Sequence, residues 1–214
     1  MNYFALINYI AVMSVTPGPN NLLITASGVN FGLRRTLPMC FGVSIGCAIQ
    51  CLIALSTFHL LFSWIEELRF PLALVGCSYL LWLSWALYRS SNTESKTQLQ
   101  QQPMGFWQMA LFQWVNPKAW LMAINIAILF SSTNASWGHY FSIALINSLT
   151  NFPCIFIWAA LGSKLKRFLQ DPKRLQIFNG CMALLMTFTA LWLLADEAIF
   201  FLDTHPIIAA KLVY

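Results

Sequence analysis

A proline-rich break interrupts the first apolar segment of this chain. Residues Ser14 to Asn21 read Ser-Val-Thr-Pro-Gly-Pro-Asn-Asn, and they lie inside an apolar run from Tyr3 to about Val29. Pro17 and Pro19 lack N–H groups, so carbonyls one turn upstream lose their intrahelical partners. Because the run is long enough to cross a bilayer, those carbonyls need protein or trapped water around them. We therefore expect a helix broken at membrane depth, which is a candidate binding site.

Composition excludes an ordinary soluble domain. The 214 residues are 58% hydrophobic and only 9% charged, whereas soluble domains carry about 25% charged residues. The net charge is +5, and the charged residues lie mostly in short loops. We therefore interpret them as indicating the orientation of the chain in the membrane, and we expect no nucleic-acid partner. The chain is predicted to be an all-α integral membrane protein that forms one transmembrane transporter domain over residues 1–214.

Six segments are apolar over the length that a spanning helix needs, about 20 residues. A polar loop at 90–102 separates the first three from the last three. A partly apolar tail at 196–214 is not expected to span. The segments are Tyr3–Val29, Pro38–Trp64, Phe70–Tyr88, Phe106–Phe130, His139–Leu161 and Gln176–Ala195.

The loops alternate in charge. One side holds most of the basic residues, whereas the other holds Arg69 and Lys211 beside several acidic residues. By the positive-inside rule the basic side faces the cytoplasm and both termini face outward. The basic side carries Arg34, Arg35, Arg89, Lys96, Lys164, Lys166, Arg167, Lys173 and Arg174.

The two halves are predicted to be inverted repeats. Thr16-Pro17 in the first segment has a counterpart at Asn116-Pro117 in the fourth. With three helices in each half, about 1–89 and 103–195, the halves must be inverted relative to each other. Paired, proline-interrupted helices near the midplane indicate the central site of a secondary transporter.

The predicted geometry suits a zwitterion. The second half-helices, starting near Asn20 and near Lys118, would point their positive dipole ends at the centre, where a carboxylate could bind. The carbonyls of Met13, Val15 and Gln113 would be free to accept from an ammonium group. An amino acid offers both groups.

Lys118 stands about 12 residues, or roughly 18 Å, into the fourth segment. A charge at that depth is costly and marks a functional site by default. Two interpretations stay open. Lys118 either binds the substrate carboxylate or couples transport, or it is a structural lysine bonded to the carbonyls of the other broken helix. No Asp or Glu is expected inside any membrane core.

Amide side chains beside the breaks also allow two roles. Asn20, Asn21 and Asn116 either line a pocket or cap the half-helices. Asn147 and Asn151 either line it or form interhelical hydrogen bonds. The candidate substrate-binding residues are Thr16, Pro17, Gly18, Pro19, Asn20, Asn21, Gln113, Asn116, Pro117, Lys118, Asn147 and Asn151.

Other patterns indicate packing rather than chemistry. Gly42-x-x-x-Gly46 favours a close helix approach, within the subunit or in a dimer. No metal site and no cofactor are expected, because the cysteines form no C-x-x-C pair and no His completes a zinc site. The six are Cys40, Cys47, Cys51, Cys77, Cys154 and Cys181.

Several of these motifs together resemble the LysE/RhtB family of amino-acid exporters. The resemblance rests on Thr16-Pro17-Gly18-Pro19-Asn20-Asn21, Gly32-x-Arg34-Arg35, Gly42 and Gly46, Gly76-x-x-Tyr79-Leu80 and Asn116-Pro117-Lys118-Ala119.

The resemblance implies a small bacterial inner-membrane exporter, and the chain is most similar to the neutral, cysteine/O-acetylserine-type branch. It implies export driven by the proton-motive force, whereas alternating access is expected from the inverted repeats. The expected partners are the lipid bilayer and a small amino acid. A homodimer is a further hypothesis. The tail after Ala195 is longer than the family implies.

Three other functions are alternatives to export. A membrane thiol-disulfide carrier of similar architecture would need a Cys in the first and fourth segments, which have none. A metal-ion exporter would need Asp, Glu or His within the membrane. A non-transporting scaffold would leave the paired breaks unexplained.

Overall fold

Seven α-helices make up all the regular structure in the part of the chain that the computed structural model describes, residues 2–92, 102–130, 135–169 and 171–204. The all-α prediction is confirmed for these residues. In chain order the helices are α1 (Tyr3–Val15), α2 (Pro19–Phe31), α3 (Leu33–Asn92), α4 (Phe106–Val115), α5 (Pro117–Phe130), α6 (Trp137–Phe168) and α7 (Pro172–Thr204).

The first predicted segment is broken, as expected. α1 ends at Val15, and α2 begins at Pro19, which takes the first helical position, where a missing N–H costs little. Gly32 then turns the chain with φ 85°, a conformation that strains other residues, so that α3 begins directly afterwards. Nearly every residue of α2 is buried, so this half-helix lies at the centre of the bundle.

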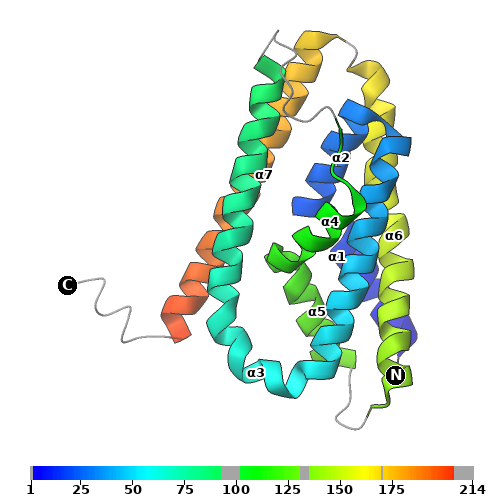
Figure 1. The fold of residues 1–214 in the computed structure, drawn as a ribbon, viewed down its shortest axis with the longest axis vertical. Helices are drawn as coiled ribbons and strands as arrows, with labels where there is room; N and C mark the ends of the chain where they lie inside the picture. The colour runs from blue at the N-terminus through cyan, green and yellow to red at the C-terminus, as the bar shows by residue number, and fades with distance from the viewer. Residues whose placement is uncertain (1, 93–101, 131–134, 170, 205–214) are drawn as a thin grey trace, which may run out of the picture.

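The second and third predicted segments form the two arms of one long helix, α3. The sequence suggested a loop between Trp64 and Phe70, but helical structure continues through it. Figure 1 shows that α3 reverses direction near its middle, so that its arms run up opposite sides of the bundle. The interior of α3 contains Pro71, and the missing N–H and the ring of a proline weaken the preceding helical turn.

The fourth predicted segment is broken too. α4 ends at Val115, Asn116 has extended backbone angles, and α5 begins at Pro117. The first arm of α3 packs tightly against α4: a Cβ on Gly42 would overlap the carbonyl oxygen of Phe106. The Gly42-x-x-x-Gly46 pattern therefore serves close packing within the chain.

The last helix is longer than the sequence indicated. α7 continues to Thr204, so the first part of the predicted tail at 196–214 is helix, and residues 205–214 lie outside the described part. Glu197 is only 2% exposed. Glu197 also lies within the candidate span Pro172–Phe201. The expectation that no acid lies inside a membrane core was therefore wrong for this residue, because the helix continues past Ala195 and buries it.

Three helical stretches are long and apolar enough to cross a membrane, and α1 and α5 are apolar but shorter. The three are Leu33–Thr57, Trp137–Phe168 and Pro172–Phe201. Large apolar side chains point outward from the bundle, among them Phe4, Trp107 and Leu184, each more than 70% exposed. A surface of this kind needs lipid rather than water around it. The chain is a multi-pass membrane protein.

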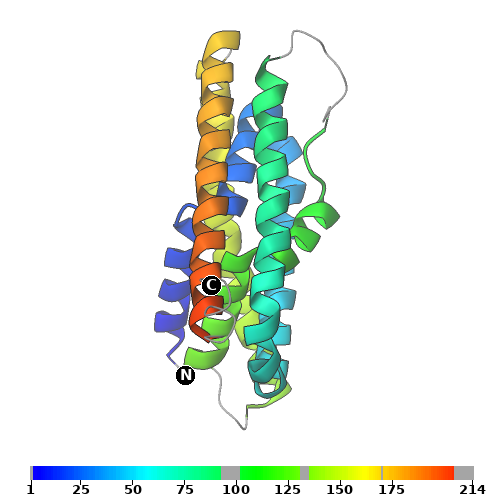
Figure 2. The same ribbon diagram turned by 90° about the vertical axis from the view of Figure 1, so that its left-hand side faces the viewer.

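The basic residues gather at one end of the bundle. The α2–α3 junction, the end of the second α3 arm and the α6–α7 junction all lie at the top of Figures 1 and 2. The N-terminus, the bend of α3 and the end of α7 lie at the opposite end. Lys96 lies outside the described residues. We call the top the basic end.

Candidate functional site

Lys118 joins the two helix breaks. It is the second residue of α5, and its Nζ donates to the carbonyl oxygens of Thr16 at 2.8 Å and Pro17 at 3.2 Å. Both carbonyls lie in the break between α1 and α2. These are the contacts that the structural interpretation of Lys118 predicts. An ammonium group has three N–H donors, so one remains for a further acceptor.

Gly18 lies against the Lys118 side chain. A Cβ at this position would come 3.0 Å from Cδ and 3.1 Å from Nζ of Lys118. The backbone of Gly18 is fully extended, with φ −178°, which any residue can adopt. The close approach of the lysine, rather than the backbone angle, thus favours glycine here.

Three amide side chains close a ring between the breaks. Asn20 donates to Gln113 Oε1 at 3.1 Å, and Asn116 donates to Asn20 Oδ1 at 3.2 Å and Gln113 Oε1 at 3.4 Å. Gln113 in turn donates to the carbonyl of Val43 at 3.3 Å. The ring ties α2 to the end of α4 and anchors both on α3.

Asn21 and Asn116 also cap the broken helices. Asn21 Nδ2 donates to the carbonyls of Ser14 and Thr16, both at 2.9 Å, and so closes the end of α1. Asn116 Oδ1 accepts from the backbone N–H of Lys118 at 3.1 Å at the start of α5. The capping role that the sequence left open is thus present at these two positions.

The two asparagines of α6 form interhelical hydrogen bonds. Asn151 donates to Ser14 Oγ at 2.9 Å and accepts from Ser44 Oγ at 3.3 Å. Asn147 donates to the carbonyl of Cys47 at 3.3 Å. These contacts attach α6 to α1 and to the first arm of α3.

A small cavity of about 30 Å³ lies where the breaks meet, and we call it the break cavity. It has room for a water molecule or two, but not for an amino acid. Seven of the predicted site residues line it: Gly18, Pro19, Asn20, Asn21, Asn116, Lys118 and Asn151.

Five predicted site residues do not line the break cavity, and several residues that do line it were not predicted. Thr16, Pro17, Gln113, Pro117 and Asn147 do not line the cavity, although the first three are bonded to residues that do. Apart from Met13, whose carbonyl was an expected acceptor, the sequence pattern missed the remaining wall because most of it consists of ordinary apolar side chains. This wall is Met13, Ser14, Cys47, Ala119, Met122 and Ile155.

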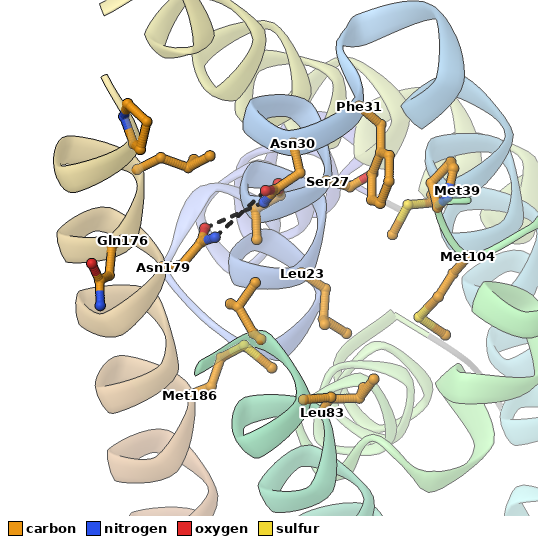
Figure 3. Close-up of a pocket in the computed structure, with 16 residues that line it drawn as sticks. Leu23, Ser27, Asn30, Phe31, Met39, Leu83, Met104, Gln176, Asn179 and Met186 are labelled. Carbon is orange, nitrogen blue, oxygen red and sulfur yellow. Dashed lines mark hydrogen bonds between the residues drawn. The ribbon is translucent and has the colours of Figure 1, made fainter. Parts of the chain in front are cut away.

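A larger cavity of about 330 Å³ lies towards the basic end, between α2, the second arm of α3 and the first turns of α7 (Figure 3). Its main polar groups are the paired amides of Asn30 and Asn179. Sequence reasoning missed both residues. Each is a single asparagine within or beside an apolar run, and no motif marks it. The two come together only in the folded protein, because they are 149 residues apart in the chain. We call this the basic-end cavity.

The break region contains both hydrogen-bond donors and acceptors. Lys118 and the amide N–H groups are donors, and the carbonyls of Thr16 and Pro17 are acceptors. All six cysteines are free thiols and none lies in α1, α2, α4 or α5. Among the described residues no three His, Cys, Asp or Glu side chains cluster as metal ligands would.

Comparison with known proteins gives a family match. The family model described as LysE type translocator matches residues 11–197. No solved structure matches the chain.

Curated relatives cover nearly the whole chain. The cysteine/O-acetylserine efflux protein of Klebsiella pneumoniae subsp. pneumoniae is 31% identical over 199 residues, which cover 90% of this chain and 96% of the relative. The protein of the same name from Escherichia coli strain K12 is 29% identical over 187 residues, or 85% of this chain and 92% of the relative. The Salmonella typhi protein of that name is 28% identical over the same length.

Proposed function

Because this chain belongs to the LysE type translocator family, we propose that it is a secondary exporter of amino acids or small amino-acid derivatives across the bacterial inner membrane. The match over residues 11–197 and the efflux names of the relatives support this proposal. Members of the family are transporters, which bears out the expectation that the chain is not an enzyme.

The observation that carries the proposal is the link between the two breaks through Lys118. Its Nζ reaches the carbonyls of Thr16 and Pro17 across the bundle. A substrate carboxylate would bind Nζ, and the substrate ammonium would take over these carbonyls. Asn20 and Asn116, whose amides face the same cavity, would complete the binding site.

We propose a substrate with an uncharged side chain. The residues that line the break cavity include one cation, Lys118, and no acid. A cationic side chain would therefore meet no opposite charge in this site, which is costly in a poorly solvated space. The names of the relatives point to cysteine and O-acetylserine as the first compounds to try.

Transport would proceed by alternating access between two inverted three-helix halves, with six spans in all. Two features support this mechanism. The break cavity is too small for an amino acid, whereas the cavity at the basic end is about ten times larger, at about 330 Å³ against 30 Å³. The observed conformation would then face the cytoplasm, with the basic end inside and both termini in the periplasm.

Export would draw on the proton-motive force, with protons entering as the amino acid leaves. Inverted vesicles that are acidified inside by respiration test this coupling. Labelled substrate should accumulate inside the vesicles against its concentration gradient, and a protonophore should abolish this accumulation. Accumulation that survives the protonophore would exclude proton coupling. A homodimer stays a hypothesis that the mass of the detergent-solubilised protein would decide.

The decisive experiment measures uptake of labelled L-cysteine and O-acetyl-L-serine into inverted vesicles. The wild type should take up at least one of them, and Lys118→Ala should lose most of that uptake. Lys164→Ala, which removes an exposed lysine of α6, is the matched control and should behave as the wild type. Equal uptake by Lys118→Ala and the wild type would remove Lys118 from the site.

A further inference from the structure

The basic-end cavity has the size and lining of a small-molecule site. Its volume of about 330 Å³ falls in the range in which proteins bind small ligands, roughly 300–1,000 Å³. Apolar side chains make most of the wall, and a few polar groups converge on it, as such sites require. Figure 3 shows Asn30 and Asn179 facing each other across the upper part of the cavity, with Leu23, Leu83 and Met186 lower down.

The two amides hold each other only loosely. Asn30 Nδ2 donates to Asn179 Oδ1 at 3.3 Å, and Asn179 Nδ2 donates back to Asn30 Oδ1 at 3.5 Å. Both distances exceed the usual value of about 2.9–3.0 Å for such bonds. Asn179 is only 2% exposed, so its amide depends on this pairing or on a ligand that replaces it.

The cavity and the break cavity lie along one face of α2. Asn20 lines the break cavity, and Leu23, Ser27 and Asn30 line the basic-end cavity. Their spacings of three, four and three residues place them in one row along the helix. Leu23 therefore stands between the two cavities, less than one helical turn from Asn20.

We propose that the basic-end cavity is the cytoplasmic access site of the transport path, where the amides of Asn30 and Asn179 bind the polar groups of the amino acid before it passes Leu23. This inference rests on the proposed export function and adds a second binding position to it. An amide offers both a donor and an acceptor, so the pair can exchange its mutual bonds for bonds to a carboxylate and an ammonium group.

The charge around the cavity agrees with a neutral or zwitterionic ligand. No acidic or basic side chain lines it. Lys166 of α6 donates from outside to the backbone carbonyl of Asn30 at 3.3 Å, which fixes the end of α2. A ligand with a net charge would find no partner of opposite sign on the wall.

Thiol labelling tests access independently of transport. Ala86 lines the cavity from α3, and Cys181 is the exposed native cysteine. In a Cys181→Ala background, the thiol of Ala86→Cys should react with N-ethylmaleimide in inverted vesicles, and O-acetyl-L-serine should slow the reaction in a saturable way. Lys164→Cys, on the surface of α6, is the control and should be labelled without protection.

Kinetics test the amide pair. The double variant Asn30→Leu/Asn179→Leu leaves no unpaired amide behind, so we expect it to fold. Its KM for uptake should rise about five- to thirtyfold, which corresponds to the loss of one or two hydrogen bonds to the substrate. Its half-protecting concentration in the labelling experiment should rise by the same factor.

A matched pair elsewhere controls for lost packing. Ser84 of α3 and Thr187 of α7 share a hydrogen bond of 2.7 Å and do not line the basic-end cavity. Ser84→Ala/Thr187→Val should leave KM unchanged. Thermal unfolding midpoints in detergent, measured for both double variants, show whether each protein is folded.

The outcomes separate the two proposals. If wild-type vesicles take up no amino acid, the proposed function fails. If the wild type transports but the double variant keeps its KM, or the amino acid does not protect the introduced thiol, the access site is wrong while the exporter function stands. Protection together with the raised KM supports the access site.

Discussion

The ammonium nitrogen of Lys118 lies 2.8 Å from the carbonyl oxygen of Thr16, although 102 residues separate the two in the chain. This bond connects the break in the first half with the break in the second. The amide ring of Asn20, Gln113 and Asn116 makes a second connection at the same level. A ligand that enters the break cavity must compete with these bonds, which links binding to movement of the two breaks.

Replacement of Lys118 should weaken both transport and stability. Lys118→Met keeps an apolar stem but removes the Lys118 donor from the carbonyls of Thr16 and Pro17, of which only Thr16 keeps another donor, Asn21. Thr16 and Pro17 are exposed on the bundle, but a backbone carbonyl at membrane depth that loses its donor still costs free energy. We expect a lower thermal unfolding midpoint in detergent and an uptake rate at least about tenfold lower, since a loss of about 1.4 kcal/mol in binding is a factor of ten. Lys164→Met is the control.

Two outcomes for Lys118→Met would contradict all or part of this expectation. If Lys118→Met unfolds at the same temperature as the wild type and transports at the same rate, the link between the breaks has neither role. Loss of transport with unchanged stability would assign Lys118 to the substrate alone.

The substitution Gly18→Ala should displace Lys118 without disrupting the backbone. The new Cβ would meet Cδ and Nζ of Lys118 at 3.0 and 3.1 Å, while the extended φ of −178° suits alanine. Because the lysine stem is flexible, we expect the ammonium group to move and KM to rise about three- to tenfold, with only a small change in unfolding midpoint. Uptake kinetics and a thermal scan measure the two effects.

Gly180 provides the matched control for that variant. A Cβ on Gly180 would meet nothing within 4 Å. Gly180→Ala should leave KM unchanged and stabilise α7 slightly, because alanine favours a helix interior by up to about 1 kcal/mol over glycine. A KM that rises equally in both variants would contradict the role of the Gly18–Lys118 contact.

Mutations in the amide ring should be energetically coupled. Asn20→Ala leaves Asn116 and Gln113 each short of one partner, and Asn116→Ala does the same to Asn20 and Gln113. The double variant should therefore be more stable than the two single effects predict, by about 0.5–3 kcal/mol. Thermal unfolding of the four proteins gives this coupling energy.

Thr189 of α7 provides the control, because its mutation is not expected to be energetically coupled to a mutation of Asn20. Its hydroxyl donates to the carbonyl of Leu185, within its own helix and away from the ring. Asn20→Ala and Thr189→Ala should be additive within about 0.5 kcal/mol. Additive effects of Asn20 and Asn116 would show instead that the ring is not a unit.

Prolines made the two breaks readable from the sequence. Pro17, Pro19 and Pro117 cannot continue a hydrogen-bonded helix, and the structure breaks at each place. Gly42 and Gly46 were readable in the same way, because small residues at a spacing of four favour close helix approach. Covalent constraints and helix periodicity act between residues that are close in the chain, so they can be recognised from the sequence.

Contacts between distant segments were not readable. No local pattern shows that Asn30 meets Asn179, or that Lys118 donates to Thr16 and Pro17 in particular. The length of α7 was misjudged for a related reason. Asp196 and Glu197 look like the end of an apolar run, but packing against the bundle buries Glu197 and extends the helix to Thr204.

The basic end should be accessible only from the cytoplasm. Lys173, at the start of α7, is exposed at the basic end, and Ser136, just before α6, is exposed at the opposite end. In a Cys181→Ala background, a membrane-impermeant maleimide should label Lys173→Cys in inverted vesicles but not in intact spheroplasts, and Ser136→Cys should show the reverse. The physical basis is the excess of Lys and Arg in short loops at the basic end, which holds those loops on the cytoplasmic side. Labelling of Lys173→Cys in spheroplasts would reverse the orientation, and the basic-end cavity would then open to the periplasm and could not admit a substrate for export.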